Sequence, residues 1–220
     1  PLSGLSELLS GDDSFLLTFP EFDHVPERPG ADYLGSWPIA GAGCVPCWPV
    51  RGRRRVFAYL APDGILPALW EAFEAVDAAV CLYAPGLAAA AIPSGLAPRV
   101  HLALEPVDLV AAAGQAEAWV TQASLNTLLA GLLGGVPQLA LPYTLEKYIV
   151  GRRLELLGAG LSAPRIRPGD IAAKLEAVLS GRDFRQVARR FAARHAGGSA
   201  AALEARLLAL LRLPETSQSG

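Results

Sequence analysis

A short polar turn at residues 121–127, with the sequence TQASLNT, holds the side chains of this chain that are best suited to bind an anion: Gln122, Ser124, Asn126 and Thr127. Leucines at positions 125, 128, 129, 132 and 133 follow with the spacing of one buried helix face, which predicts a helix that begins near Ser124. A helix start directs free backbone N–H groups at an anion, so the turn is a candidate phosphate site. The alternative is that the Ser124 hydroxyl only caps the helix, which stabilises it by ~1 kcal/mol.

A second polar turn, PYTLEK at residues 142–147, places Glu146 and Lys147 at the start of the next predicted helix. That helix covers about 145–157, and Gly158 and Gly160 are its stop signals. Lys147 fits a phosphate or an acidic sugar, and it fits a solvated lysine at a helix start equally well.

The elements that must position these turns alternate along the chain. Strands are predicted at 14–19, 55–61, 78–84, 99–104, 117–121 and 138–141, and further helices at 65–76 and 106–114. Near-continuous apolar strands separated by helices indicate an α/β fold, a doubly wound parallel sheet of roughly six strands between residues 53 and about 168. Ligands of such sheets bind beyond the carboxyl ends of the strands, where the turn at 121–127 lies.

Three more helices are expected near the end of the chain: one with Asp170 as its N-cap, one from about Asp183 to His195, and one after Ser199.

The organisation along the chain is predicted to have three parts. Residues 20–52 are rich in proline and glycine, so residues 1–52 are expected to form a linker. Residues 53–213 are expected to form the compact domain, and residues 214–220 a disordered tail.

Composition and charge exclude several classes of function. With 220 residues, of which 52% are hydrophobic, the chain can bury a substantial core. A net charge of −2 gives no long-range attraction for nucleic acid or an anionic membrane, and the basic run at 51–55 is interpreted as a solvated loop. No uninterrupted apolar run reaches the ~20 residues of a membrane span.

Cysteine usage does not indicate a metal or redox site. Cys44 and Cys47 have the two-residue gap of a zinc or redox pair, but no second pair and no nearby histidine accompany them. A plain loop is therefore the favoured interpretation. With Cys81 the count is odd, which fits a reducing compartment, so we expect a cytoplasmic protein.

Residues 120–161, VTQASLNTLLAGLLGGVPQLALPYTLEKYIVGRRLELLGAGL, resemble the signature of nucleotide-sugar-dependent glycosyltransferases of the two-Rossmann-domain (GT-B) architecture. The pattern is most similar to that of bacterial enzymes that glycosylate macrolides, sterols and flavonoids. It runs from His-Gly-Gly through Thr, a helix and Gly-Val-Pro to Asp-Gln or Glu-Gln and Leu-Gly-Ala-Gly. Residues 16–37 resemble the segment that leaves the family's acceptor domain, and residues 174–198 its last helices. The resemblance implies a donor-binding half, with a missing N-terminal acceptor-binding domain as partner.

The resemblance also implies where the donor pyrophosphate binds. Gln122, Ala123 and Ser124 stand for His-Gly-Gly, Thr127 keeps the family's threonine, and Asn126 lies at the same helix start. Alanine and serine add a Cβ where backbone must approach a phosphate closely. Gln122 can donate a neutral hydrogen bond but cannot become the cation that histidine can. The electrostatic part of the phosphate grip is therefore expected to be weakened.

Other positions depart from the family as well. Leu104 stands where an aromatic residue often stacks on the nucleotide base, so only apolar contact remains. Gly131 stands for an acidic residue that holds ribose hydroxyls, and a mid-helix glycine costs about 1 kcal/mol relative to alanine. Glu146 and Lys147 stand for the pair that binds sugar hydroxyls, with the carboxylate kept and the amide replaced by a donor-only cation.

The activity implied is transfer of a sugar from a nucleotide diphosphate to a hydroxyl of a small-molecule acceptor, with inversion and without a metal or other cofactor. Such enzymes take a general base from the acceptor domain, and His24, His101 and His195 match no such role. We therefore assign no catalytic residue to this chain. A degenerate relative that serves as a binding or auxiliary module stays open, as do an epimerase of the same architecture and a homodimer.

Overall fold

The computed structural model describes residues 15–25, 28–37, 42–62, 64–165, 167, 169–197 and 200–211. These residues belong to two compact units, one of residues 39–196 and the other of residues 1–38 with residues 197–220. The expected division into a linker at 1–52 and a domain at 53–213 stays a prediction. The expected tail at 214–220 lies outside the described residues.

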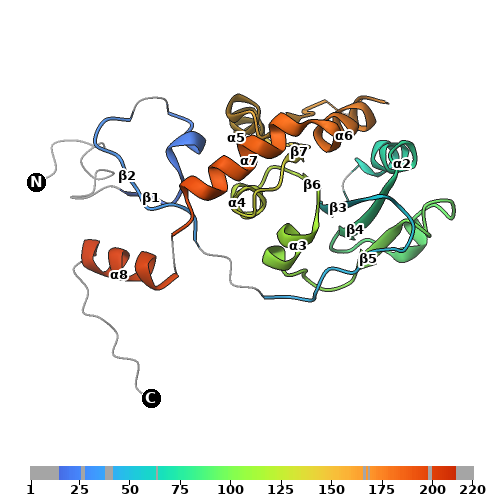
Figure 1. The fold of residues 1–220 in the computed structure, drawn as a ribbon, viewed down its shortest axis with the longest axis horizontal. Helices are drawn as coiled ribbons and strands as arrows, with labels where there is room; N and C mark the ends of the chain where they lie inside the picture. The colour runs from blue at the N-terminus through green and yellow to red at the C-terminus, as the bar shows by residue number, and fades with distance from the viewer. Residues whose placement is uncertain are drawn as a thin grey trace, which may run out of the picture. The chain divides into compact units, whose positions relative to one another are not determined.

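The larger unit is built on a parallel sheet of six strands in the order β5-β4-β3-β6-β7-β8 (Figure 1). The strands are β3 (Arg54–Tyr59), β4 (Ala78–Tyr83), β5 (Val100–Ala103), β6 (Ala118–Thr121), β7 (Gln138–Ala140) and β8 (Gly160–Ser162). The predicted doubly wound α/β class is confirmed. Because the chain runs outward from β3 to β5 and then returns to start again at β6, the strand order reverses between β3 and β6.

Helices cover both faces of this sheet. One face carries α2 (Leu66–Ala75) and α6 (Asp170–Ser180), and the other carries α3 (Leu109–Gln115), α4 (Leu125–Leu133) and α5 (Leu145–Leu157). The helix α7 (Arg182–Arg194) packs against α4, and a short 3₁₀ helix, η2 (Ala89–Ala91), precedes β5. Each of the helices α2 to α6 follows a strand of the parallel sheet, so all five begin at its carboxyl edge.

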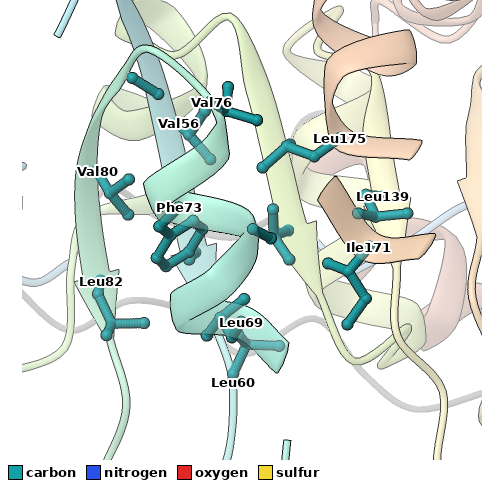
Figure 2. Packing of buried hydrophobic residues seen from close by; sticks show 14 of the residues in the cluster. Val56, Leu60, Leu69, Phe73, Val76, Val80, Leu82, Leu139, Ile171 and Leu175 are labelled. Carbon is teal, nitrogen blue, oxygen red and sulfur yellow. The ribbon is translucent and has the colours of Figure 1, made fainter. Parts of the chain in front are cut away.

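The core explains why the sequences of the strands are nearly continuous apolar runs. Figure 2 shows Leu69 and Phe73 of α2 lying over the strands, with Val80 of β4 beside them. Neighbouring strand residues point to opposite faces, so Val56 joins this cluster while Phe57 packs with Trp119 on the other face. Helices cover both faces, so most strand positions favour an apolar side chain.

The strand β8 was not expected, because its first residue, Gly160, reads as a helix stop signal. Gly158 alone ends α5, with a left-handed φ of 77°. A Cβ at position 160 would lie 2.0 Å from the backbone oxygen of Gln138, so only glycine lets β8 approach β7 there. Glycine is a requirement of sheet packing at this position.

Two further details differ from expectation in the larger unit. Asp170 is the first residue of α6 and pairs with Lys174 at 3.2 Å, while Gly169 occupies the N-cap with a left-handed φ of 75°. The basic run at 51–55 is only partly a loop, because Arg54 and Arg55 are the first residues of β3.

The smaller unit contains two short parallel strands, β1 (Phe15–Leu16) and β2 (Asp32–Tyr33), the 3₁₀ helix η1 (Pro20–Phe22) and the helix α8 (Ala200–Leu210). The strand predicted at 14–19 is therefore shorter than expected, with Ser14 outside the described residues.

Buried Asp23 organises the centre of this unit. Its carboxylate accepts hydrogen bonds from Arg28 Nε at 3.0 Å, the Tyr33 hydroxyl at 2.7 Å and the Val25 amide at 2.9 Å. The Arg28 guanidinium, followed by the Tyr33 hydroxyl, holds the pKa of Asp23 well below its usual range. Arg206 of α8 and Asp32 of β2 form an ion pair in the same unit.

Candidate functional site

A pocket of about 190 Å³ opens at the carboxyl edge of the sheet. Its lining residues come from the ends of β3 and β6, the segment after β4 and the start of α4: Tyr59, Ala61, Pro85, Thr121, Gln122, Ser124 and Thr127. The strand order reverses between β3 and β6, so the pocket lies at the position where doubly wound sheets bind ligands.

The pocket brings together three residues of the predicted site, Gln122, Ser124 and Thr127. It also includes Tyr59 and Thr121, which the sequence pattern did not single out. Tyr59 is the last residue of β3 and pairs in register with Thr121 at the end of β6. The two are 62 positions apart in sequence, so only the strand order could have indicated that they meet.

The start of α4 is open to a ligand. Ser124 occupies the N-cap in an extended conformation, but its side chain makes no capping hydrogen bond. The interpretation of Ser124 as only a helix cap is therefore wrong. The amides of the first helical turn, at residues 125–127, have no partner within the helix, and Ser124 and Thr127 line the pocket beside them.

Gln122 is largely occupied by the protein itself. Its Oε1 accepts a hydrogen bond from the Ala61 amide at 3.0 Å, and its Nε2 donates to the Ala61 carbonyl at 3.1 Å. The side chain is 93% buried and ties the end of β6 to the loop after β3. One amide hydrogen remains for a ligand, so Gln122 is chiefly a structural link between the two strands.

Ala123 keeps the backbone shape of a glycine. Its φ of 59° lies in the left-handed region, and its amide donates to the Thr121 hydroxyl at 3.3 Å. An alanine is strained there, as expected for a residue at a glycine position. Its methyl group is fully buried and does not line the pocket, so Ala123 does not block an anion.

Tyr59, at the end of β3, also lines the pocket. Its ring lies beside that of Tyr83, with ring centroids 4.9 Å apart. Burial, and to a smaller extent the neighbouring Tyr83, raises the pKa of Tyr59 above its ordinary value. At neutral pH the hydroxyl is therefore protonated and can donate a hydrogen bond to a phosphate oxygen.

Besides Ala123, four predicted site residues lie outside the pocket lining. Asn126 is exposed in the first turn of α4, and Leu104, 82% exposed, follows the edge strand β5. Glu146 is exposed at the start of α5. Lys147 donates to the Tyr143 hydroxyl at 2.8 Å, and its Nζ lies 4.0 Å from the centre of that ring. An exposed aromatic side chain thus already engages this cation.

The match of Gly131 with an acidic ribose-binding residue is wrong. Position 131 is buried, and a Cβ there would lie 2.6 Å from Gln138 Nε2 and 2.8 Å from Trp119 Cε3. An acidic side chain has no room on this side of α4. The sequence pattern predicts that glycine destabilises α4 at this position relative to alanine. In the structure glycine is favoured there, because a larger residue would prevent α4 from packing on the sheet.

Other candidate groups do not add to the site. Cys44, Cys47 and Cys81 are free thiols, and burial raises the pKa of Cys81 to about 11. Within the described ranges, no three His, Cys, Asp or Glu side chains are placed to hold a metal ion. None of the three histidines lines the pocket. No helix in the described part of the chain is long and apolar enough to cross a membrane.

Comparison with known proteins finds glycosyltransferases that are similar to this chain. No protein-family model matches the chain. A PGL/p-HBAD biosynthesis glycosyltransferase of Mycobacterium tuberculosis (strain H37Ra) is 36% identical over 84 residues, which are 37% of this chain and 20% of that protein. The matched segment therefore spans a fifth of the curated relative.

Solved glycosyltransferases share the fold over most of the chain. The glycosyltransferase SnogD from Streptomyces nogalater superposes with a TM-score of 0.67 and 26% identity over 89% of this chain and 56% of its own. Os79 from O. sativa, solved in complex with UDP, has a TM-score of 0.59 and 15% identity over 72% of this chain and 41% of its own. This chain therefore has the fold of the carboxyl-terminal half of a GT-B glycosyltransferase and shares sequence with a curated glycosyltransferase.

Proposed function

We propose that this chain is the donor-binding half of a glycosyltransferase that moves a sugar from a nucleotide diphosphate to a hydroxyl of a small-molecule acceptor, with inversion. One observation carries the proposal: the pocket of about 190 Å³ at the strand-order reversal is bordered by the uncapped start of α4. Backbone amides at such a position favour a diphosphate. Os79, which shares this fold, was solved with UDP, so uridine diphosphate is the first donor nucleotide to test.

The proposed binding mode follows from the polar groups present. The diphosphate lies over residues 124–127, where the first-turn amides and the hydroxyls of Ser124 and Thr127 donate to its oxygens. Tyr59 adds a third hydroxyl from β3. The nucleotide base lies toward Leu104, and the sugar toward Glu146 and Lys147. For Lys147 to reach the sugar it must leave the Tyr143 ring, an exposed contact that costs little to break.

The proposed reaction uses two halves of a larger assembly. The acceptor oxygen forms a bond to the anomeric carbon of the donor sugar while the bond from that carbon to the diphosphate oxygen breaks. A general base on an acceptor-binding domain takes the acceptor's proton, and the diphosphate leaves with the electron pair. The amides at the start of α4 stabilise the charge that grows on the leaving group, a role that does not require a metal ion.

Affinity for the donor is expected to be low. No histidine cation faces the diphosphate here, and Gln122 is engaged with Ala61. Each charge-assisted hydrogen bond contributes ~1.5 to 3 kcal/mol, so losing one or two weakens binding by roughly tens- to hundreds-fold relative to an intact family member.

The proposal is tested by calorimetric titration of the chain with uridine, thymidine and guanosine diphosphates and their sugars. A triple variant, Gln122→His with Ala123→Gly and Ser124→Gly, restores the family pattern. We expect weak binding of one nucleotide by the native chain and tighter binding by the variant. If the variant folds normally and neither protein binds any nucleotide, the donor-binding proposal is wrong.

A second candidate function is a catalytically inactive relative that acts as a binding or auxiliary module. The observation that favours it is the double hydrogen bond between Gln122 and Ala61, which uses for structure the position that the family uses for phosphate. A chain of this kind would ignore every nucleotide in the titration above.

A further inference from the structure

A second hollow lies at the opposite edge of the sheet, where α6 ends and α7 begins. Its volume is about 300 Å³, and three arginines line it together with Gln186 and the α6–α7 corner. The amino edge is identified by two contacts: Arg54, the first residue of β3, bonds to Ser180, and Arg185 bonds to the Glu117 carbonyl just before β6. The nucleotide pocket lies at the other end of the same strands.

The three arginines share one face of α7. Arg182, Arg185 and Arg189 are spaced three and four residues apart, so their side chains are neighbours on the helix surface. Like charges at this spacing destabilise a helix unless an opposite charge lies among them. The helix start adds positive character, because Gly181 occupies the N-cap and supplies no capping side chain.

Carboxylates of the protein neutralise only part of this charge. Glu117 pairs with Arg185 at 3.7 Å, and its other oxygen accepts from the Arg55 amide at 3.3 Å. Glu176 accepts from the hydroxyl of Ser180, which lines the hollow, and pairs with Arg54, so it pairs with none of the three arginines. Within the described residues, Arg182 and Arg189 make no ion pair, and exposed Asp183 makes none either.

Two of the arginines are already held in place. Arg185 donates to the Glu117 carbonyl at 3.0 Å, which fixes its guanidinium at the rim. The Cγ of Arg189 lies 3.2 Å from where a Cβ of Gly135 would stand, so its stem is packed on the corner after α4. Arginine side chains that are partly fixed in this way, one at its guanidinium and one at its stem, lose less freedom when an anion binds.

We propose that this hollow binds a phosphate-type dianion, either free or as the headgroup of a lipid, at a site separate from the nucleotide pocket. Planar guanidinium groups bind phosphate oxygens with paired hydrogen bonds, and three of them match the charge of a dianion after Glu117 has neutralised one. The hollow is larger than a single phosphate, so it admits an organic group attached to the phosphate.

The test titrates inorganic phosphate into the full chain and follows the amide NMR signals of residues 183–185 at the start of α7. We expect these signals to shift with one dissociation constant, and binding to weaken when NaCl is added. The variants Arg182→Gln and Arg189→Gln should each weaken binding by about five- to tenfold. Arg190→Gln is the matched control, because Arg190 is exposed on the same helix but does not line the hollow, and it should leave binding unchanged.

A vesicle arm identifies the source of the phosphate. Phosphatidylcholine vesicles with and without phosphatidic acid are sedimented with the native chain and with Arg182→Gln. Retention by phosphatidic acid alone, lost in the variant, supports a lipid headgroup, and phosphate binding without vesicle retention supports a free phosphate compound. If residues 183–185 respond to neither probe, or if Arg190→Gln weakens binding as much as Arg189→Gln, the proposal is overturned.

Discussion

Three helices begin on the same face of the sheet at its carboxyl edge, and their first turns are treated differently. Asp108 caps α3 by accepting from the amides of Val110 and Ala111, and Thr144 caps α5 by accepting from the amide of Lys147. Ser124 stands at the same point of α4 with a hydroxyl that caps nothing. At the starts of α3 and α5 a side chain of the protein already accepts hydrogen bonds from first-turn amides, so those amides are not available to a ligand. The uncapped start of α4 is the one that borders the pocket, so its amides and hydroxyls remain for a ligand.

The largest effect on stability is expected where α4, which has no side-chain cap, lies closely against the sheet at Gly131. Gly131→Ala places a Cβ against Gln138 and Trp119 and should lower the free energy of unfolding by about 1 to 3 kcal/mol, measured by urea denaturation. Gly114→Ala is the matched control, because that helical glycine has open space around it and should be neutral or gain up to about 1 kcal/mol. Equal effects from the two variants would mean that α4 is not held by close contact with the sheet.

Removing the cap of α3 should have the next largest effect. Asp108→Ala deletes two hydrogen bonds, of 2.8 and 3.0 Å, and should cost about 1 kcal/mol of unfolding free energy. Thr144→Ala deletes one longer bond, of 3.4 Å, and should cost roughly half as much. Urea denaturation measures both. If Asp108→Ala leaves the free energy of unfolding unchanged, side-chain caps do not account for the difference between these helix starts.

The smallest effect on stability is expected at Ser124. Ser124→Ala should change the unfolding free energy by less than about 0.5 kcal/mol, since no capping bond is lost. Affinity for a nucleotide diphosphate should nevertheless fall about fivefold, because one hydroxyl donor of the pocket is removed. A large loss of stability with unchanged affinity would place Ser124 with Asp108 and Thr144 as a helix cap.

The sequence predicts the fold well because periodicity and burial act locally. Apolar spacing predicts buried strands such as β4 and the leucine face of α4. The candidate anion-binding turn is predicted from its place after β6. Close approach between elements is not readable in this way. From the sequence alone, Gly131 is a weak helix position and Gly160 is a helix stop signal. Their packing roles become clear only from their neighbours in the fold, Trp119 and Gln138 for Gly131 and Gln138 for Gly160.

The site was predicted in part for a similar reason. Ser124 and Thr127 follow from the helix start, whereas Tyr59 reaches the pocket through the strand order, which no local pattern contains. The role of Gln122 depends on its contact with Ala61, sixty-one residues earlier, so the sequence alone left its side chain available to a ligand.

The most direct test of the α4 start as the donor site is an amide NMR titration of the full chain with uridine diphosphate. We expect the signals of Leu125, Asn126 and Thr127 to shift together with one dissociation constant, while those of Val110 and Ala111, whose amides are engaged by Asp108, stay in place. Ser124→Ala should weaken the response without changing the spectrum elsewhere. Saturating nucleotide that leaves residues 125–127 unmoved, or that moves another surface instead, would contradict the assignment of the α4 start as the donor site.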